Sequence, residues 1–197
     1  MCGMVIGAQD VDHSSGSRTG AISIEMLEEC GYGVEFVIIG HSERREFFHE
    51  DNDLIRKKIH AVEESKICTT ILCIGETKEE NKIGVTKDVL KNQLSVINGF
   101  ELSKNFTIAY EPVWAIGSGQ TPEPKDINEI HKYIKDVVQS VSENNHVPEV
   151  VYGGSVTDKN AESFFKEEFV DGALVGGASL NGTTFANIVN IWRENII

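Results

Sequence analysis

Residues 106–122 read Phe-Thr-Ile-Ala-Tyr-Glu-Pro-Val-Trp-Ala-Ile-Gly-Ser-Gly-Gln-Thr-Pro, and this stretch decides how the rest of the chain is interpreted. Phe106 to Tyr110 form a short apolar run between turn signals, which is typical of a buried parallel strand. The run ends at Glu111, and Pro112 keeps that glutamate out of the helical region. An apolar segment then leads to a pair of glycines, an arrangement that suits a hinged lid.

Glu111 permits two interpretations. A carboxylate at the C-terminal end of a strand, beneath a lid, can be shielded from water and act as a general base. A glutamate at a strand–loop junction can equally serve only to cap the backbone. The spacing alone favours neither interpretation.

Composition narrows the classes of protein to consider. A chain of 197 residues can bury one sizeable core. Its 18 Lys and Arg against 31 Asp and Glu give a net charge of −13, which argues against a general surface for nucleic acid or anionic membrane. We expect reduced thiols and a cytoplasmic protein, because no secretory pattern and no apolar run of membrane-spanning length accompany the four cysteines.

Strand-like and helix-like segments alternate along the whole chain. This strict alternation predicts six βα units with parallel strands in one α/β domain, residues 1–197. Strands are expected near Val5, Val37, Ile71, Ile108, Val151 and Ala173. Helices are expected over 24–30, 51–64 and 86–97, after Pro124, from Thr157 or Asp158 onward, and around 185–192.

Polar residues and glycines collect where the strands end. Gly40-His41 and Gly75-Glu76 follow two of the strands, and Gly153–Ser155 and Gly176-Gly177 follow the last two. In (β/α)₈ barrels this face carries the active site. Glycine-rich loops before helices offer backbone N–H groups to a phosphate, so the last two loops predict a phosphate-binding site.

Four segments, taken together and in order, resemble the triosephosphate isomerase family. They are Gly40-His-Ser-Glu-Arg-Arg45, Ala109-Tyr-Glu-Pro-Val-Trp-Ala-Ile-Gly117, Tyr152-Gly-Gly-Ser-Val156 and Val175-Gly-Gly-Ala-Ser-Leu180. The resemblance runs from Val5 to the C-terminus. It implies a TIM (β/α)₈ barrel in which only the units from the family's third strand to its eighth helix are present, so that residues 1–197 form a single barrel domain without the first two βα units.

The resemblance also implies an activity, the interconversion of dihydroxyacetone phosphate and D-glyceraldehyde 3-phosphate through an enediolate, in glycolysis and gluconeogenesis. Glu111 would be the base and His41 the electrophile, kept neutral by the helix start that follows it. Glu43 would support the electrophilic side. The backbone N–H groups that would bind the phosphate belong to Gly117, Ser155, Gly176 and Gly177. No metal or organic cofactor is implied, and the partners would be a small phosphorylated triose and a second copy of the chain in a homodimer.

Two departures from the family pattern leave other classes open. No residue matches the family's Asn-x-Lys motif, and Ala21 stands where the dimer loop usually has glutamate. One alternative is a catalytically inactive barrel fragment or pseudoenzyme that acts as an interaction protein. The other is a different phosphate-binding barrel enzyme, against which segments 40–45 and 110–117 argue strongly.

Overall fold

The computed structural model describes residues 5–30, 33–66, 68–116 and 121–195, and the strands within them form one six-stranded sheet. Every neighbouring pair is parallel and follows the order of the chain, so the parallel α/β prediction is confirmed. All six strands lie where the sequence places them. They are β1 (Ile6–Ala8), β2 (Val34–Ile39), β3 (Thr69–Ile74), β4 (Thr107–Tyr110), β5 (Glu149–Tyr152) and β6 (Gly172–Ala173).

One row of fully buried side chains crosses the middle of the sheet. Ile39 pairs with Leu72, and Leu72 pairs with Ile108. Ile108 in turn pairs with Val150, and each of these side chains is 0% exposed. Burying one such aliphatic side chain stabilises the fold by about 1.5–3 kcal/mol relative to leaving it exposed. The row therefore fixes the register, because a slip by one residue would turn these side chains to the other face.

The fixed register also aligns the carboxyl ends of the strands. The N–H of Glu111 donates to the carbonyl of Ile74 at 2.7 Å, and the N–H of Gly153 donates to the carbonyl of Tyr110 at 2.8 Å. The parallel ladder thus continues one residue beyond β4 and β5. Residues that directly follow neighbouring strands consequently lie side by side at this end of the sheet.

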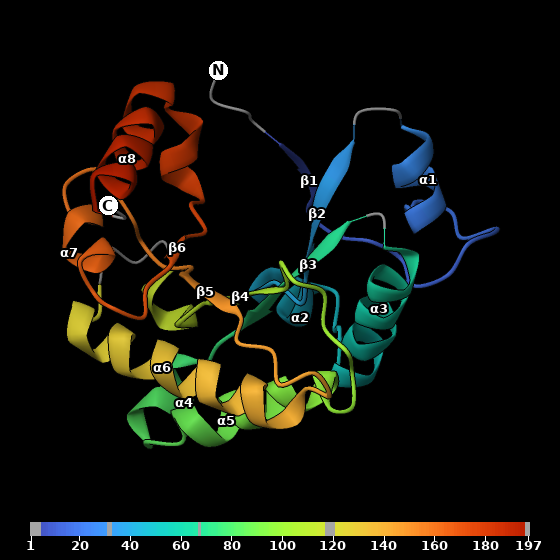
Figure 1. Cartoon of the computed structure of the whole chain (residues 1–197), viewed down its shortest axis with the longest axis horizontal. Coiled ribbons are helices and arrows are strands. Elements are labelled where there is room, and N and C mark those ends of the chain that lie inside the picture. The colour runs from blue at the N-terminus through green and yellow to red at the C-terminus, as the bar shows by residue number, and fades with distance from the viewer. Residues whose placement is uncertain (1–4, 31–32, 67, 117–120, 196–197) are drawn as a thin grey trace.

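Helices lie around the strands, as Figure 1 shows. They are α1 (Ile24–Glu29), α2 (Ser42–Phe47), α3 (Asn52–Ser65), α4 (Lys78–Lys82), α5 (Thr86–Leu94), α6 (Pro124–Val141), α7 (Ala161–Phe165) and α8 (Gly182–Asn195), with short 3₁₀ helices at Ser95–Ile97, Val113–Ala115 and Gly177–Leu180. Side-chain caps explain several starts, since Ser23, Asp51 and Thr77 each accept a hydrogen bond from a backbone N–H of the first turn.

Two helix predictions differ from the structure, and one short helix was not predicted. The helix expected over 86–97 changes to 3₁₀ geometry at Ser95. The start expected at Thr157 or Asp158 is wrong, because the Asn160 side chain accepts from the Thr157 N–H at 2.7 Å and closes a turn before α7. Helix α4 was not predicted, because its five residues include no buried side chain and so show no apolar period.

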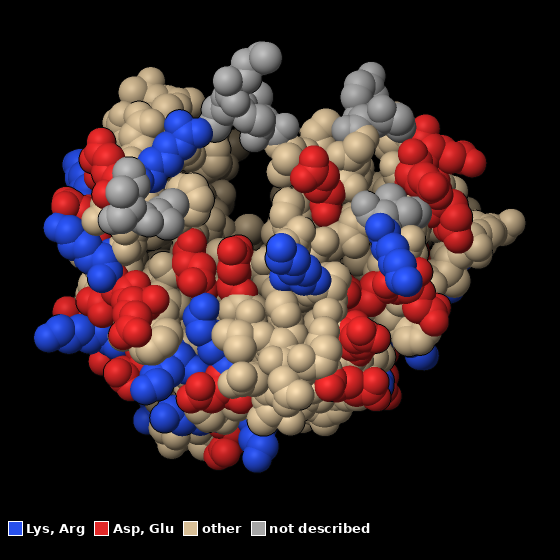
Figure 2. Space-filling model, viewed as in Figure 1, with Lys and Arg blue, Asp and Glu red and all other residues tan. Residues whose placement is uncertain are grey.

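The sheet ends at β1 on one side and at β6 on the other, within the part of the chain that the structure describes. Ile6 in β1 is 49% exposed, unlike the aliphatic side chains of the central strands. Figure 2 shows the molecule hollowed between the part that carries α8 and the part that carries β1 and β2, and shows acidic and basic side chains spread over the same face. Among the described helices, none has the length and apolar character needed to cross a membrane.

Candidate active site

Glu111 is held deep between two glycines at the carboxyl ends of the strands. Its exposed fraction is only 3%. A Cβ added at Gly75 would overlap the backbone carbonyl of Glu111, and one added at Gly153 would lie 2.8 Å from the Glu111 Cγ. Neither position has room for a side chain, so the absence of one at both positions lets the neighbouring strands close around this carboxylate.

The two oxygens of the Glu111 carboxylate contact the start of α2. Oε1 lies 3.1 Å from Nε2 of His41. Oε2 accepts a hydrogen bond from the backbone N–H of Ser42 at 3.0 Å. The structure therefore brings together Glu111 and His41, which are 70 residues apart in the sequence, across the ends of β2 and β4. The contribution of the Ser42 backbone was not predicted, because a backbone donor has no signature in the sequence.

The ring of His41 has a defined orientation because it caps the short helix that follows it. Its Nδ1 accepts the backbone N–H of Glu43 at 3.2 Å. An accepting Nδ1 carries no proton, so the neutral ring holds its proton on Nε2, the atom that faces Glu111. The side chain is 29% exposed, which leaves this nitrogen open to a bound molecule.

The contact with Glu111 changes the expectation about the charge of His41. The hydrogen bond that His41 donates to the Glu111 carboxylate raises the pKa of His41 above its ordinary value of 6.5, with burial acting in the opposite direction. The helix start was expected to keep the ring neutral, and the N–H of Glu43 does disfavour a proton on Nδ1. In this arrangement the carboxylate outweighs that effect.

Glu43 is positioned differently from the other predicted catalytic residues. Its carboxylate Oε2 lies 4.0 Å from Nδ1 of His41, and its side chain is 70% exposed. The closer contact with the imidazole is made by its backbone N–H. The geometry thus assigns the support of the His41 ring mainly to the main chain of Glu43.

A cavity of about 360 Å³ adjoins the pair of Glu111 and His41. Its other walls include Ser155, Gly176 and Gly177, three of the four residues predicted to bind phosphate. A Cβ added at either glycine would meet nothing within 4 Å, so both positions face open space. The fourth predicted residue, Gly117, and the glycine pair of the lid lie outside the described residues.

The first part of the expected lid is anchored to a buried carboxylate. Glu76, which directly follows Gly75 and is 0% exposed, accepts from the Tyr110 hydroxyl at 3.0 Å and from Nε1 of Trp114 at 2.9 Å. From the opposite wall, the hydroxyl of Ser155 donates to the carbonyl of Ala115 at 2.7 Å. From the sequence, Glu76 could be placed only at a strand end, because the partners of its carboxylate come from β4 and from the loop that follows it.

These features define an α/β protein with a site at the carboxyl ends of parallel strands, where a buried carboxylate and an imidazole are suited to moving a proton. A family model described as triosephosphate isomerase matches residues 2–192. The triosephosphate isomerase of Alkaliphilus metalliredigens is 43% identical over 191 residues, covering 94% of this chain and 76% of the relative. That of Aquifex aeolicus is 44% identical over 191 residues, covering 95% and 76%, and that of Chlamydia felis is 44% identical over 188 residues, covering 93% and 73%. The chain belongs to the triosephosphate isomerase family, and its parallel sheet with surrounding helices agrees with the α/β barrel class.

The raised pKa of His41 predicts a pH-dependent contribution to stability. Because the folded-state pKa lies above the ordinary value of 6.5, the contact with Glu111 contributes fully below pH 6.5, and this contribution is lost as the pH rises through the folded-state pKa. The free energy of unfolding of the unsubstituted chain minus that of His41→Gln should therefore decrease as the pH rises over about 5 to 8. Urea denaturation at a series of pH values measures this difference.

His131 also makes the free energy of unfolding depend on pH. Subtracting the value for His41→Gln from that for the unsubstituted chain removes this contribution. Burial lowers the pKa of His131 to about 3, so its contribution to stability falls as the pH drops below 6.5. Both proteins in the comparison retain His131, so this effect cancels. The matched control is the same difference measured in a Glu111→Gln background. There it should no longer decrease as the pH rises, because burial, which remains, acts on the pKa of His41 in the opposite direction. A decrease of the same size in that background would contradict the assignment to the contact between His41 and Glu111.

Proposed function

We propose that Glu111, His41 and the two glycine-rich loops carry out the reaction for which this isomerase family is named, the interconversion of dihydroxyacetone phosphate and D-glyceraldehyde 3-phosphate. The observation that carries the proposal is the direct approach of the Glu111 carboxylate to Nε2 of His41, 3.1 Å apart, beside a cavity that the loops of β5 and β6 enclose. The Glu111 carboxylate, which can accept or return a proton, and Nε2–H of His41, which can donate a hydrogen bond, thus both face this cavity.

The reaction requires one proton to move between adjacent carbons and a second proton to move between the oxygens that those carbons carry. Glu111 takes a proton from the carbon next to the carbonyl group, and the negative charge passes to the carbonyl oxygen. The Nε2–H of His41 donates a hydrogen bond to that oxygen and stabilises the enediolate. Glu111, now protonated, returns the proton to the neighbouring carbon. The hydroxyl proton moves to the former carbonyl oxygen, which Nε2–H of His41 contacts, so the other oxygen becomes the new carbonyl oxygen and the isomerisation is completed without any net change in the protein.

Binding of the substrate must first separate the two side chains. Glu111 and His41 already contact each other, so a reacting carbon and oxygen can enter only if the carboxylate leaves His41. This separation removes the contact that raises the pKa of His41, whereas the N–H of Glu43 still occupies Nδ1. We infer that the imidazole acts as a neutral donor in the complex, as the family resemblance implies.

We propose that the phosphate binds to the backbone N–H groups of Ser155, Gly176 and Gly177, with Gly117 completing the site from the lid. Ser155, Gly176 and Gly177 line one cavity together with Glu111 and His41. This supports a single phosphorylated substrate that reaches from the phosphate-binding loops to the proton-transfer residues. Ser155 also bonds the carbonyl of Ala115 in the lid segment, so the phosphate loop and the lid are already in contact. A lid that closes over this cavity would exclude water from the enediolate.

We further propose that the chain forms one domain, works in the cytoplasm and assembles as a homodimer. One core cluster extends from Val11 to Ile188, which supports a single domain. Phe47 and Phe48, at the end of α2, are 65% and 61% exposed, and such large apolar side chains suit an interface with a second copy. The cytoplasmic location rests on the place of this family in glycolysis.

Replacing Glu111 by glutamine tests the assignment of the base. In Glu111→Gln, kcat should fall about 10²–10⁴-fold, because the amide cannot accept the proton. Binding of a phosphorylated competitive inhibitor should change little, because the loops that hold the phosphate are unaltered. Steady-state kinetics and inhibitor titration measure the two effects.

The matched control is Glu162→Gln, which removes an exposed carboxylate that pairs with Lys166 on α7. It should leave both quantities unchanged. Near-normal turnover in Glu111→Gln would rule this residue out as the base. Absence of turnover in the unsubstituted chain would instead favour the inactive barrel that serves as an interaction protein.

Gly153 provides a second test, based on the space around the base. An alanine Cβ at this position would lie 2.8 Å from the Cγ of Glu111, so Gly153→Ala should displace the carboxylate. A shift of this kind should lower kcat by about tenfold to a hundredfold. Gly182→Ala, where an added Cβ meets nothing within 4 Å, is the matched control and should retain kcat. Equal kcat values for the two variants would show that the position of Glu111 does not limit the reaction.

A further inference from the structure

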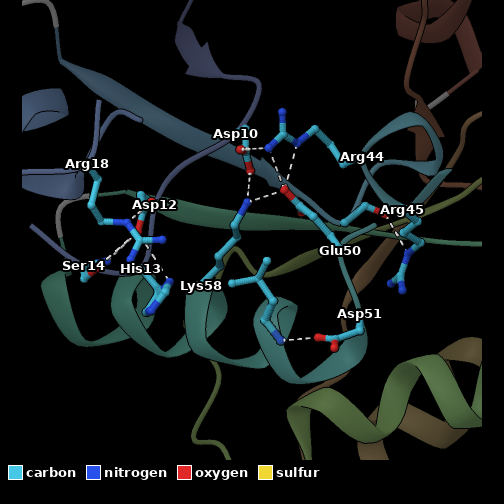
Figure 3. A network of polar contacts seen from close by, with 12 residues as sticks. Asp10, Asp12, His13, Ser14, Arg18, Arg44, Arg45, Glu50, Asp51 and Lys58 are labelled. Atoms are coloured by element: carbon cyan, nitrogen blue, oxygen red, sulfur yellow. Dashed lines mark hydrogen bonds and ion pairs between the residues drawn. The ribbon is translucent and has the colours of Figure 1, made fainter. Parts of the chain in front are cut away.

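Four charged side chains form a closed ring, as Figure 3 shows, and one of them, Arg44, belongs to the short helix α2 that begins directly after His41. Nζ of Lys58 lies 2.7 Å from Asp10 Oδ1 and 2.7 Å from Glu50 Oε1. Nη2 of Arg44 lies 2.7 Å from the same oxygen of Glu50 and 2.9 Å from Asp10 Oδ2. Two acidic and two basic groups thus alternate around the ring, so their formal charges cancel.

The ring joins parts of the chain that are otherwise far apart. Asp10 follows the edge strand β1, Arg44 belongs to α2, Glu50 lies in the loop between α2 and α3, and Lys58 belongs to α3. Two of the four side chains are almost completely buried: that of Lys58 is 5% exposed and that of Glu50 is 2% exposed. Buried charges are tolerated only with partners, so removing one member leaves the others uncompensated.

Helix α2 depends on such polar contacts for its position. It has six residues, and none of them is buried, so it has no apolar face to pack against the core. A helix this short is not stable on its own in water. Besides Arg44 in the ring, Arg45 anchors it by donating to the Gly40 carbonyl at 2.9 Å and to Asn52 Oδ1 at 3.1 Å.

The same short helix places the groups that face Glu111. His41 is its N-cap, and the N–H of Ser42, its first residue, donates to the Glu111 carboxylate. Arg44 is only two residues beyond Ser42, within the first turn. Any tilt of α2 that follows loss of the Arg44 contacts must therefore move the imidazole and the Ser42 N–H relative to Glu111.

We propose that the ring formed by Asp10, Arg44, Glu50 and Lys58 is a positioning device for the active site, which holds α2 in the orientation that aims His41 at Glu111. None of the four side chains lines the cavity beside His41, so the ring acts through α2 and not by touching a substrate. The inference rests on the proposed function for its kinetic consequence, but its structural consequence can be measured without turnover.

A double-substitution cycle tests the kinetic consequence. Glu50→Gln keeps the shape of the side chain, and it removes the charge that both Arg44 and Lys58 contact. We expect kcat to fall about tenfold to a hundredfold, as for a small misplacement of a catalytic group, with less than a threefold change in the binding of a phosphorylated inhibitor. In a His41→Gln background the same substitution should lower kcat by less than about threefold, because the group that it positions is absent.

The matched control is a variant of another partly buried ion pair, which lies at the amino-terminal ends of the strands, away from His41 and Glu111. Nζ of Lys135 on α6 lies 2.5 Å from Asp171 Oδ2, just before β6. Lys135→Met should lower the melting temperature without changing the kcat of the folded protein. Asp10→Asn provides a milder change of the ring itself, since Asp10 is 25% exposed, and it should lower kcat less than Glu50→Gln does.

The second measurement is the pKa of His41, followed by NMR in the protein without inhibitor. The charged groups that face the imidazole of His41 are Glu111 and, at 4.0 Å, Glu43. Both remain when Asp10 or Glu50 is substituted. In Glu50→Gln the pKa of His41 should move down toward its ordinary value as the contact with Glu111 loosens, and in Lys135→Met it should not move.

Two results would overturn the positioning role. One is an unchanged pKa of His41 in a folded Glu50→Gln protein. The other is a loss of kcat that is equally large with and without His41. If the unsubstituted chain shows no turnover, the proposed function fails, and the NMR measurement alone decides whether the ring positions His41. Should Glu50→Gln fail to fold, Asp10→Asn decides the same question by the same two measurements.

Discussion

The Glu111 carboxylate bridges two groups at the start of α2, and the arrangement of the site depends on this contact. One oxygen approaches Nε2 of His41 and the other accepts the N–H of Ser42. The contact can form only because the register of β3, β4 and β5 brings Gly75, Glu111 and Gly153 to one level, where the two glycines leave room for it. The buried apolar row in the sheet thus determines the geometry of a polar pair several residues away.

The same contact suggests how the free site and the occupied site differ. In the free arrangement the carboxylate is paired with His41, and this pairing favours the charged imidazole. The Glu43 N–H favours the opposite state by occupying Nδ1. A substrate that displaces the carboxylate changes the balance between these two effects, so the protonation of His41 is coupled to whether the site is filled. The buried anchor of Trp114 on Glu76 and the bond from Ser155 to Ala115 place the lid segment beside the same cavity.

The strands and the longer helices could be predicted from the sequence because their signals are local. The apolar run ending at Glu111 indicates a strand, and the stripe from Ile127 to Val141 indicates a helix. The resemblance to the family supplied the pairing of His41 with Glu111, which spacing alone left open. What could not be predicted are contacts between distant segments, such as the Ser42 N–H on Glu111 and the partners of Glu76. The short helices α2 and α4 bury no side chain, so no apolar period marks them.

The position of the proton on His41 tests the account most directly. Nitrogen-15 NMR of the protein, at a pH above the folded-state pKa of this residue, distinguishes the two neutral forms of its ring. The account predicts a proton on Nε2, directed at Glu111, and an unprotonated Nδ1 that accepts the N–H of Glu43. A proton on Nδ1 would contradict it, because Nε2 could then donate neither to Glu111 nor to the carbonyl oxygen of a substrate.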